Sequence, residues 1–522
     1  MGTIRGWLRS VGILCLAGTG VALTACAGLP PGANTPRSAS MRLDRPESTA
    51  LGRQAAAASS AHHSYSGFRI ITPGLDGLLV RVQMIDAAER TLDLQYFIFR
   101  GDTTGRLITA ALQRAAARGV RVRVLVDDSD TVPGDEQLLS LDGHPNMEVR
   151  VFNPFVYRGH SNSLRAVEFL FNARRLDYRM HNKLLVVDAA VALVGGRNIG
   201  DQYFQIDPES QFADDDVFVA GPVADELAAT FDEYWNSVLA IPAAALGHIR
   251  TPAAAASASN EFAARIATGE PFAGINSGRL PLVWAHAQVV CDSPDKKAIK
   301  NGEQAGRMMG AAVLSAASAT QSELLMVTPY FIPTPEELQV LRDLRHRQVR
   351  VRILTNSMEA NPAAFAHSGY VPYRVPMVQD GVELYEARAR LGNTQGSGQT
   401  AEISRHGNYA LHAKLFAFDR QRLFIGSMNF DRRSKNLNTE VGLIIDSPEL
   451  AQQTAARFAA MVQPQNAYQL ALRAPASGHA PQLYWRTEEA GWSVDYLSEP
   501  ARSSWQRVAV QSMSLLPVGD EQ

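Results

Sequence analysis

The chain has 522 residues, a length that predicts two to four domains. Apolar residues make up 46% and charged residues 20%, an ordinary globular composition that excludes wholesale disorder, collagen and coiled coil. The formal net charge of −2 gives no basic excess and does not favour non-specific nucleic-acid binding. Two of the three cysteines lie in the N-terminal segment, so Cys291 stands alone in the body and an intramolecular disulfide framework is excluded.

The N-terminal segment, residues 1–25, has the pattern of an export signal. Two arginines precede an apolar stretch, residues 11–23, that is too short to span a bilayer comfortably. Leu23-Thr24-Ala25-Cys26 resembles the bacterial lipobox, which implies cleavage before Cys26 and lipidation of its thiol. The alternatives are an ordinary secretory signal or an uncleaved anchor with a chance cysteine. The lipobox predicts a lipid-anchored envelope protein that faces the periplasm, and Ala27 after the cysteine favours the outer membrane.

Three further segments stand apart by composition. Residues 26–65 are rich in Pro, Ser and Ala without an amphipathic period, which predicts a disordered tether. Residues 241–280 have a similar composition and are interpreted as the connection between two halves. Residues 463–522 have no copy elsewhere and are predicted to form a C-terminal cap, whose tryptophans 485, 492 and 505 serve in packing or as interfacial anchors.

The body of the chain contains two copies of one sequence pattern, residues 66–240 and 281–462. The first copy predicts a strand at 91–98, a helix at 105–118 and a strand at 119–128. The second predicts a strand at 323–332, a helix at 335–347 and a strand at 349–357. Nearly continuous apolar strands that alternate with helices predict an α/β fold, with a mixed, mostly parallel sheet covered on both faces in each half.

Both halves carry the motif His-x-Lys-x₄-Asp, followed by Gly-Gly or Gly-Ser and an Asn. His412 follows His181 by 231 positions, and Asn429 follows Asn198 by the same interval. One such motif is commonly a surface feature, but two copies in register make coincidence negligible. The candidate site residues given by the repeat are His181, Lys183, Asp188 and Asn198 in the first half and His412, Lys414, Asp419 and Asn429 in the second.

These residue types suit a phosphoryl group. Positions i and i+2 of a strand point to one side, so each histidine faces the same site as the lysine of its motif. The glycines let the backbone approach a ligand closely. Fixed cations and amide donors stabilise a phosphate in the transition state, while one imidazole attacks phosphorus and the other protonates the leaving oxygen. Lysine is scarce in this chain, which has 50 Lys and Arg together but only six Lys, so its presence in both motifs indicates a required point charge. The scheme requires no metal and no cofactor.

The duplicated motif resembles that of the phospholipase D superfamily, over about residues 70–460. The resemblance implies a bilobal, pseudo-twofold α/β fold with one active site at the interface of the halves and a covalent phosphohistidine intermediate. It implies that His181 is the nucleophile and His412 the general acid and later base. It also implies that phosphoryl oxygens are bound by Lys183, Lys414, Asn198 and Asn429, and that Asp188 and Asp419 hold the motif loops.

Members of this superfamily also carry an acid that orients a histidine. Asn438-Thr439-Glu440 matches that pattern in the second half. Aligning Gly221-Pro222 with Ser447-Pro448 places Asp214 opposite Glu440. Two further aspartates follow Asp214 directly, so the alignment leaves this assignment uncertain by one residue. The alternative is a hydrated cluster of aspartates.

Longer matching stretches of sequence narrow the range of candidate substrates. The stretches 178–183, 194–204 and 367–374 resemble bacterial cardiolipin synthases, especially the C type. That resemblance implies phospholipid substrates at a membrane surface, transfer of a phosphatidyl group from phosphatidylethanolamine to phosphatidylglycerol, and no nucleic-acid partner. Classical cardiolipin synthases carry transmembrane helices, whereas this chain has a lipoprotein signal. Hydrolytic phospholipase D, a periplasmic nuclease and a non-enzymatic envelope scaffold remain alternatives, and the oligomeric state stays open. Near the first motif, Arg174, Arg175 and Arg179 are candidates for headgroup contacts or for a solvated basic face.

Overall fold

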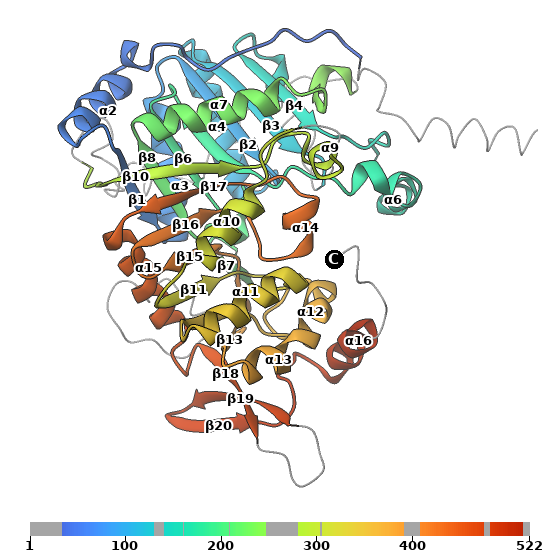
Figure 1. Ribbon diagram of the computed structural model, residues 1–522. Coiled ribbons are helices and arrows are strands. Elements are labelled where there is room, and N and C mark those ends of the chain that lie inside the picture. Colours follow the sequence, from blue (N-terminus) through green and yellow to red (C-terminus); the bar gives the residue numbers. More distant parts are fainter. Residues whose placement is uncertain are drawn as a thin grey trace, which may run out of the picture.

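The computed structural model describes residues 34–129, 140–159, 161–207, 209–246, 280–302, 305–390, 408–473 and 481–514. The predicted signal (1–25), Cys26 and most of the predicted connection (247–279) lie outside the described residues. In Figure 1 the first half lies above the second, and β10 and β17 cross the middle of the molecule.

The two halves build the same order of strands. The first half runs β9 (Ala240–Pro242), β4 (Met147–Phe152), β3 (Arg121–Asp127), β2 (Thr91–Tyr96), β5 (Lys183–Val187), β6 (Val191–Gly195), β8 (Asp216–Ala220), β1 (Ser66–Ile71). The second runs β18 (Ala467–Arg473), β13 (Glu383–Ala387), β12 (Arg350–Asn356), β11 (Glu323–Val327), β15 (Leu415–Phe418), β16 (Arg422–Gly426), β17 (Val441–Asp446), β10 (Val283–Cys291). The expected duplicated α/β fold is confirmed.

The halves meet edge to edge. Strands β1 and β10 pair antiparallel, with Ser66 opposite Ala285, and so join both sheets into one continuous sheet. A second, two-stranded sheet also links the halves, because β7 (Ser210–Ala213) pairs in parallel with β14 (Asn408–Leu411). Main-chain pairing in two sheets therefore joins the halves, in addition to side-chain packing.

The sheet is buried on both faces. In β5, Leu184 and Val186 pack into a core that also contains α7 (Pro222–Trp235) and α15 (Pro448–Met461), one helix from each half. Leu185 and Val187 face the opposite core, beneath α3 (Gly74–Ala87) and α4 (Thr103–Ala117). A third core holds α10 (Met309–Ser318) and α11 (Pro335–His346) of the second half. The predicted strand–helix–strand units correspond to β2–α4–β3 and β11–α11–β12.

The expectation of mostly parallel pairing is wrong in detail. In each half only the three strands of the β-α-β region are parallel, and the motif strands return antiparallel beside them. A tight hairpin then adds the next strand antiparallel to each motif strand: Asp188 and Ala189, between β5 and β6, have φ values of 52° and 50°, and Asp419 and Arg420, between β15 and β16, have 56° and 53°. Two consecutive positive φ angles form the turn type that closes antiparallel pairs. An apolar run gives no sign of strand direction, so the sequence did not reveal this.

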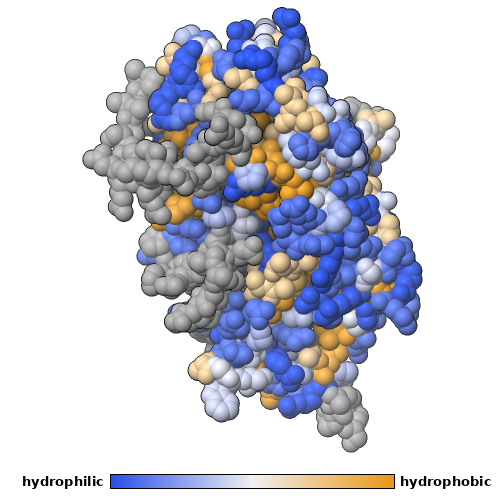
Figure 2. All heavy atoms as spheres, turned by 90° about the vertical axis from the view of Figure 1, so that its left-hand side faces the viewer, coloured by the Kyte–Doolittle hydropathy of each residue, from blue (hydrophilic) through white to orange (hydrophobic). Residues whose placement is uncertain are grey.

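The expectation of a disordered tether over 26–65 is wrong for its C-terminal part. Pro46–Ser48 form a 3₁₀ turn and Ala50–Ala61 form α2, which begins with the Thr49 side chain accepting from the Gly52 amide. Alanine is the best helix former, so the alanine run is a helix, and Leu51 and Ala55 are buried. The helix covers an apolar pocket that also involves Leu282 and Trp284. Figure 2 views this side of the molecule and shows apolar residues gathered in its upper part.

The expectation that residues after 462 have no copy is also wrong in part. Strand β18 pairs antiparallel with β13 just as β9 pairs with β4, so it completes the repeat. Within the described part of this segment, β19 (Gln482–Glu489), β20 (Trp492–Tyr496) and α16 (Ser504–Ser514) have no counterpart in the first half. Trp485 is buried and donates to Glu386, whereas Trp492 and Trp505 are exposed. Among the described residues, no helix has the length and apolar character needed to cross a membrane.

Candidate active site

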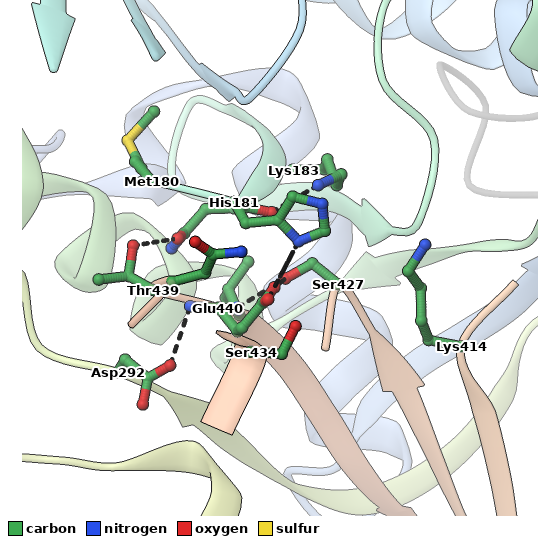
Figure 3. Close-up of polar contacts among 12 residues, drawn as sticks. Met180, His181, Lys183, Asp292, Lys414, Ser427, Ser434, Thr439 and Glu440 are labelled. Atoms are coloured by element: carbon green, nitrogen blue, oxygen red, sulfur yellow. Dashed lines mark hydrogen bonds and ion pairs between the residues drawn. The ribbon is translucent and has the colours of Figure 1, made fainter. Parts of the chain in front are cut away.

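The two motifs meet at the interface of the halves. His181 lies just before β5 and His412 just before β15, and all four motif histidines and lysines are at most 8% exposed. Each lysine folds back onto its own motif: Lys183 Nζ donates to the His181 carbonyl at 2.6 Å, and Lys414 Nζ to the His412 carbonyl at 2.5 Å. Figure 3 shows His181 and Lys183 on one side of the site and Lys414 on the other. The predicted grouping is therefore present.

Each histidine is held by an acid of the opposite half. His181 Nδ1 lies 3.0 and 2.9 Å from the two carboxylate oxygens of Glu440, and His412 Nδ1 lies 2.6 Å from Asp214 Oδ2. Both acids are buried. The open register of the aspartates is settled by these contacts, since Asp214 and not its neighbours faces His412. With Nδ1 bound to a carboxylate, each neutral ring keeps Nε2 as an acceptor, and at His412 the Lys414 Nζ lies 3.2 Å from it.

The backbone fixes these crossed pairs. The His181 amide donates to the Thr439 carbonyl at 2.9 Å, and Thr439 directly precedes Glu440. In the other motif the His412 amide donates to the Ala213 carbonyl at 2.8 Å, and Ala213 directly precedes Asp214. The second contact continues the β7–β14 pairing. Main-chain bonds thus set each acid beside the histidine of the other half.

The two asparagines differ. Asn198 is used inside the protein: its Oδ1 accepts from the Ile98 amide at 3.2 Å, and its Nδ2 donates to the Tyr203 hydroxyl at 2.9 Å. Asn429 is also buried, but its Oδ1 has no hydrogen-bond partner. An unpartnered polar atom in a buried site is costly. The equal roles expected for Asn198 and Asn429 therefore do not match their present contacts.

The two motif aspartates lie away from the histidines. Asp188 accepts from the amides of Glu89, Arg90 and Thr91 at 2.8–3.0 Å, and so holds the start of β2. Asp419 accepts in the same way from the amides of residues 321–323 before β11. Both act as loop anchors, as the resemblance implied.

Burial controls the charges in the site. Burial and the neighbouring lysines lower the pKa of His412 to about 3 and that of His181 well below its usual range, so both rings are neutral at pH 7. Burial also lowers the pKa of Lys414 to about 8.

The pKa values of the two acids differ. Burial raises the pKa of Glu440 to about 7, whereas at Asp214 the nearby His412 and Lys414 outweigh burial and lower the pKa to about 2. The crossed pairs are therefore related by the repeat but differ in charge.

Comparisons with known proteins agree with this geometry. A family described as "Cardiolipin synthase, PLD-like domain" matches residues 82–235 and 313–462. Cardiolipin synthase C of Escherichia coli strain K12 is 37% identical over 473 residues, which cover 88% of this chain and 97% of that protein. The chain belongs to the phospholipase D-like family of cardiolipin synthases.

More distant relatives share the fold. The major cardiolipin synthase of Bacillus subtilis strain 168 is 28% identical over 397 residues, covering 74% of this chain and 67% of that protein. The crystal structure of phosphatidylserine synthase from Haemophilus influenzae Rd KW20 covers 80% of this chain and 92% of that chain, with a TM-score of 0.53 and 14% sequence identity. The latter similarity concerns the fold alone.

The glycines that follow the two motifs in this family member have a different role from the expected approach to a ligand. A Cβ on Gly196 would lie 2.1 Å from Asp214 Oδ1, so Gly196 makes room for the acid. The matching position in the second half is Ser427, whose hydroxyl donates to Glu440 at 2.5 Å. One acid thus gains space and the other gains a donor.

Sequence reasoning missed an aromatic shell around the histidines. The Phe97 ring lies 4.9 Å from His181, and the rings of Tyr203 and Phe212 lie 5.2 and 5.3 Å from His412. These rings pack against the imidazoles. Aromatic residues at these positions carry no local pattern that marks them.

Sequence reasoning also missed a buried ion pair beneath Glu440. Asp292 accepts from the Glu440 amide at 3.0 Å and pairs with Lys296 at 2.8 Å (Figure 3 shows Asp292). Lys296 is fully buried, and the scarcity of lysine in the chain was a signal that pointed to it.

The stretch 367–374 has a structural contact that its resemblance did not reveal. His367 Nε2 lies 2.7 Å from Glu499, and Arg374 donates to both Glu499 oxygens at 2.6 and 2.9 Å. Glu499 belongs to the C-terminal segment. The motif therefore fastens that segment to α12 (Ala364–Tyr370) and α13 (Arg374–Gln379).

Asp188→Ala tests the anchoring role. Three backbone amides lose their acceptor, so we expect the free energy of unfolding to fall by about 2 kcal/mol or more, measured by denaturant unfolding. Asp419→Ala is the matched control and should cost less, because Asp419 is more exposed. The kcat of the folded protein should change little in either variant. A large loss of kcat without loss of stability would instead place Asp188 against the substrate.

Gly196→Ala tests the space reserved for Asp214. The new methyl group displaces the carboxylate from His412, so we expect kcat to fall on the order of a hundredfold, as misplaced catalytic groups do. Gly200→Ala is the control, since a Cβ there meets its neighbours only at 3.5 Å or more. Equal kcat values for the two variants would contradict the argument.

Proposed function

We propose that this chain is a phospholipase D-type phosphatidyltransferase that makes cardiolipin. It transfers a phosphatidyl group from phosphatidylethanolamine to phosphatidylglycerol through a covalent phosphohistidine on His181. The observation that carries the proposal is the crossed pairing of His181 with Glu440 and of His412 with Asp214, which brings two imidazoles and two lysines into one buried site. The substrates are proposed from the similarity to cardiolipin synthase C.

The reaction proceeds in two displacements at phosphorus. His181 Nε2 attacks the phosphorus of the donor, the bond to the ethanolamine oxygen breaks, and that oxygen takes a proton from His412 Nε2. In the second step a glycerol hydroxyl of phosphatidylglycerol gives its proton to His412 and attacks phosphorus, and the P–N bond breaks. His181 returns neutral and His412 protonated, so protons balance over the cycle.

The acids support this division of roles. Asp214 is ionised, with its pKa lowered to about 2, and a full negative charge favours a protonated His412 that acts as acid. Burial raises the pKa of Glu440 to about 7, so it holds less charge and leaves His181 neutral and nucleophilic. Two groups whose environments separate their pKa values divide acid and base work.

A bound substrate adds a negative charge to the site. Without that charge, burial lowers the pKa of both motif lysines and both histidines. A bound phosphodiester carries a negative charge beside these groups and raises their pKa values, which protonates His412 when the substrate is in place. Asn429, with its unpartnered side-chain oxygen, is the asparagine positioned for a further polar contact.

We also propose that the protein is attached to a membrane by a lipid on Cys26 and faces the periplasm, at the outer membrane in preference to the inner membrane. This proposal is supported by the lipobox-like sequence and by the membrane lipids that the reaction requires. Hydrolysis remains the competing outcome at the same site, because water and an alcohol accept the same phosphatidyl group. A nuclease is disfavoured by the net charge of −2.

Lipid mass spectrometry tests the activity. Purified full-length protein, incubated with vesicles of phosphatidylethanolamine and phosphatidylglycerol, should form cardiolipin and release ethanolamine. His181→Ala should lower the rate by roughly a thousandfold or more, because the nucleophile is lost. His286→Ala, which removes an exposed histidine on β10, is the matched control and should retain full activity. Phosphatidic acid alone would make the protein a hydrolase, and cleavage of DNA without lipid products would make it a nuclease.

The pH dependence tests the lysines. We expect kcat/KM to fall above about pH 8, since Lys414 then loses the proton that gives it the charge to bind phosphate. Lys414→Arg keeps its charge at alkaline pH and should lack this decline, although its kcat/KM is lower throughout. A decline at the same pH in both proteins would assign it to another group.

A further inference from the structure

Helix α6 (Asn162–Leu176), between β4 and the first motif, has its polar and apolar faces reversed. Its inward side carries the buried polar residues Arg165, Glu168 and Asn172. Its outward side carries Leu164, Val167, Leu170 and Phe171, which are 51%, 47%, 76% and 65% exposed. A helix on the surface of a globular protein normally has the opposite arrangement.

The inward polar contacts hold this orientation in place. Glu168 accepts from the amides of Val156 and Tyr157 at 2.7 and 2.8 Å. Arg165 donates to the Asp128 carbonyl, and its guanidinium lies 4.1 Å from the centre of the Phe155 ring. Turning the helix over would bury apolar residues but would break all of these contacts. The exposure of the apolar side is therefore built into the packing.

The helix is attached beside the active site. Asp128, which binds Arg165, follows Asp127 at the end of β3. Asp127 accepts from the Met180 amide at 2.9 Å, and Met180 directly precedes His181. One strand end thus holds both α6 and the first motif. A surface that contacts α6 therefore lies close to the first motif in the fold.

A second apolar set lies on the same side of the molecule. In α16 Trp505 and Val508 are 82% and 52% exposed, and in the adjacent α12 Phe365 is 45% exposed. Figure 1 shows α6, α12 and α16 along the same edge. Exposed tryptophan is typical of the boundary between lipid and water.

The charge of α6 favours lipid as the covering partner. Glu168 is the only acidic residue of the helix and is turned inward. Of the three arginines considered for headgroup contacts, Arg179 is buried and Arg175 binds Asn153 and Pro154. Arg174 is exposed in the last turn. An apolar strip that ends in a cation matches acyl chains beneath anionic phosphates.

We propose that the outward face of α6, Leu164, Val167, Leu170 and Phe171, inserts into the surface of a phospholipid bilayer and holds the active site against it. The inference deepens the proposed function and rests on it, because a lipid substrate must enter the site with its headgroup leading while its acyl chains stay in the bilayer. A donor lipid then reaches the buried histidines without its acyl chains crossing water.

A dye on the helix tests the insertion without catalysis. In the full chain, Leu170→Cys is labelled with an environment-sensitive nitrobenzoxadiazole dye and mixed with vesicles of phosphatidylethanolamine and phosphatidylglycerol. We expect a blue shift of the emission at this position. Val238→Cys is the matched control, being 66% exposed outside α6, and should show none. The native chain, treated with the same dye, corrects for labelling of its own cysteines.

Activity provides the second measurement. The double variant Leu170→Asp/Phe171→Asp should make product about tenfold or more slowly on vesicles, since two side chains no longer enter the bilayer. On short-chain phospholipid dispersed as monomers, its rate should stay within about twofold of the native rate, because additional charges on exposed surface are tolerated. Val238→Asp should leave both rates unchanged.

The outcomes separate the alternatives. A blue shift in a protein that forms no lipid product would refute the proposed function and leave the insertion standing. An equal fall on vesicles and on monomers would show that α6 supports the site directly and would overturn the inference. The absence of a blue shift, with a dimer in light scattering that the double variant dissociates, would show that a second copy covers the helix.

Discussion

Everything in the active site depends on a carboxylate that reaches across to the histidine of the other half. Because Glu440 orients His181 and Asp214 orients His412, neither half has a complete site. The edge pairing of β1 with β10, the parallel pairing of β7 with β14 and the core shared by α7 and α15 all serve to keep this distance fixed. A shift of one half against the other would separate both pairs at once. The duplication thus has a mechanical consequence, since one interface positions two histidines.

A symmetric pair of histidines would be poorly suited to the proposed reaction, in which one ring attacks while the other gives up a proton. The chain breaks the symmetry with small changes around a common frame. Glu440 replaces the shorter Asp214, and Ser427 stands where Gly196 leaves room for a carboxylate. The carboxylates then differ in pKa, about 7 against about 2, in sites that the repeat makes otherwise equivalent. The two imidazoles are chemically the same, so their different surroundings are what gives them different proton affinities.

The sequence predicted what repetition and residue chemistry specify, namely two α/β halves, two histidine–lysine motifs and both orienting acids. It did not reveal that each acid serves the opposite histidine, because that pairing depends on how two distant segments meet. Strand direction was mistaken for a related reason, since an apolar run is the same in either direction. The alanine run in α2 was read by composition as a linker, although alanine is equally the strongest helix former, and Leu51 gave it a core contact. The sequence could in principle have pointed to Lys296, because lysine is scarce in this chain.

The lysines show why a phosphodiester suits this site better than water does. Burial lowers the pKa of Lys183 and Lys414, so the site holds their charges at a cost that the carboxylates only partly offset. An anionic phosphate removes that cost, and the same negative charge draws a proton onto His412. In the proposed mechanism, substrate binding and activation of the general acid are therefore one electrostatic event. Water carries no charge to do the same, and the rings of Phe97, Tyr203 and Phe212 crowd the histidines that it must reach. An alcohol delivered on a lipid from the adjacent bilayer arrives at a site already prepared by the first phosphate.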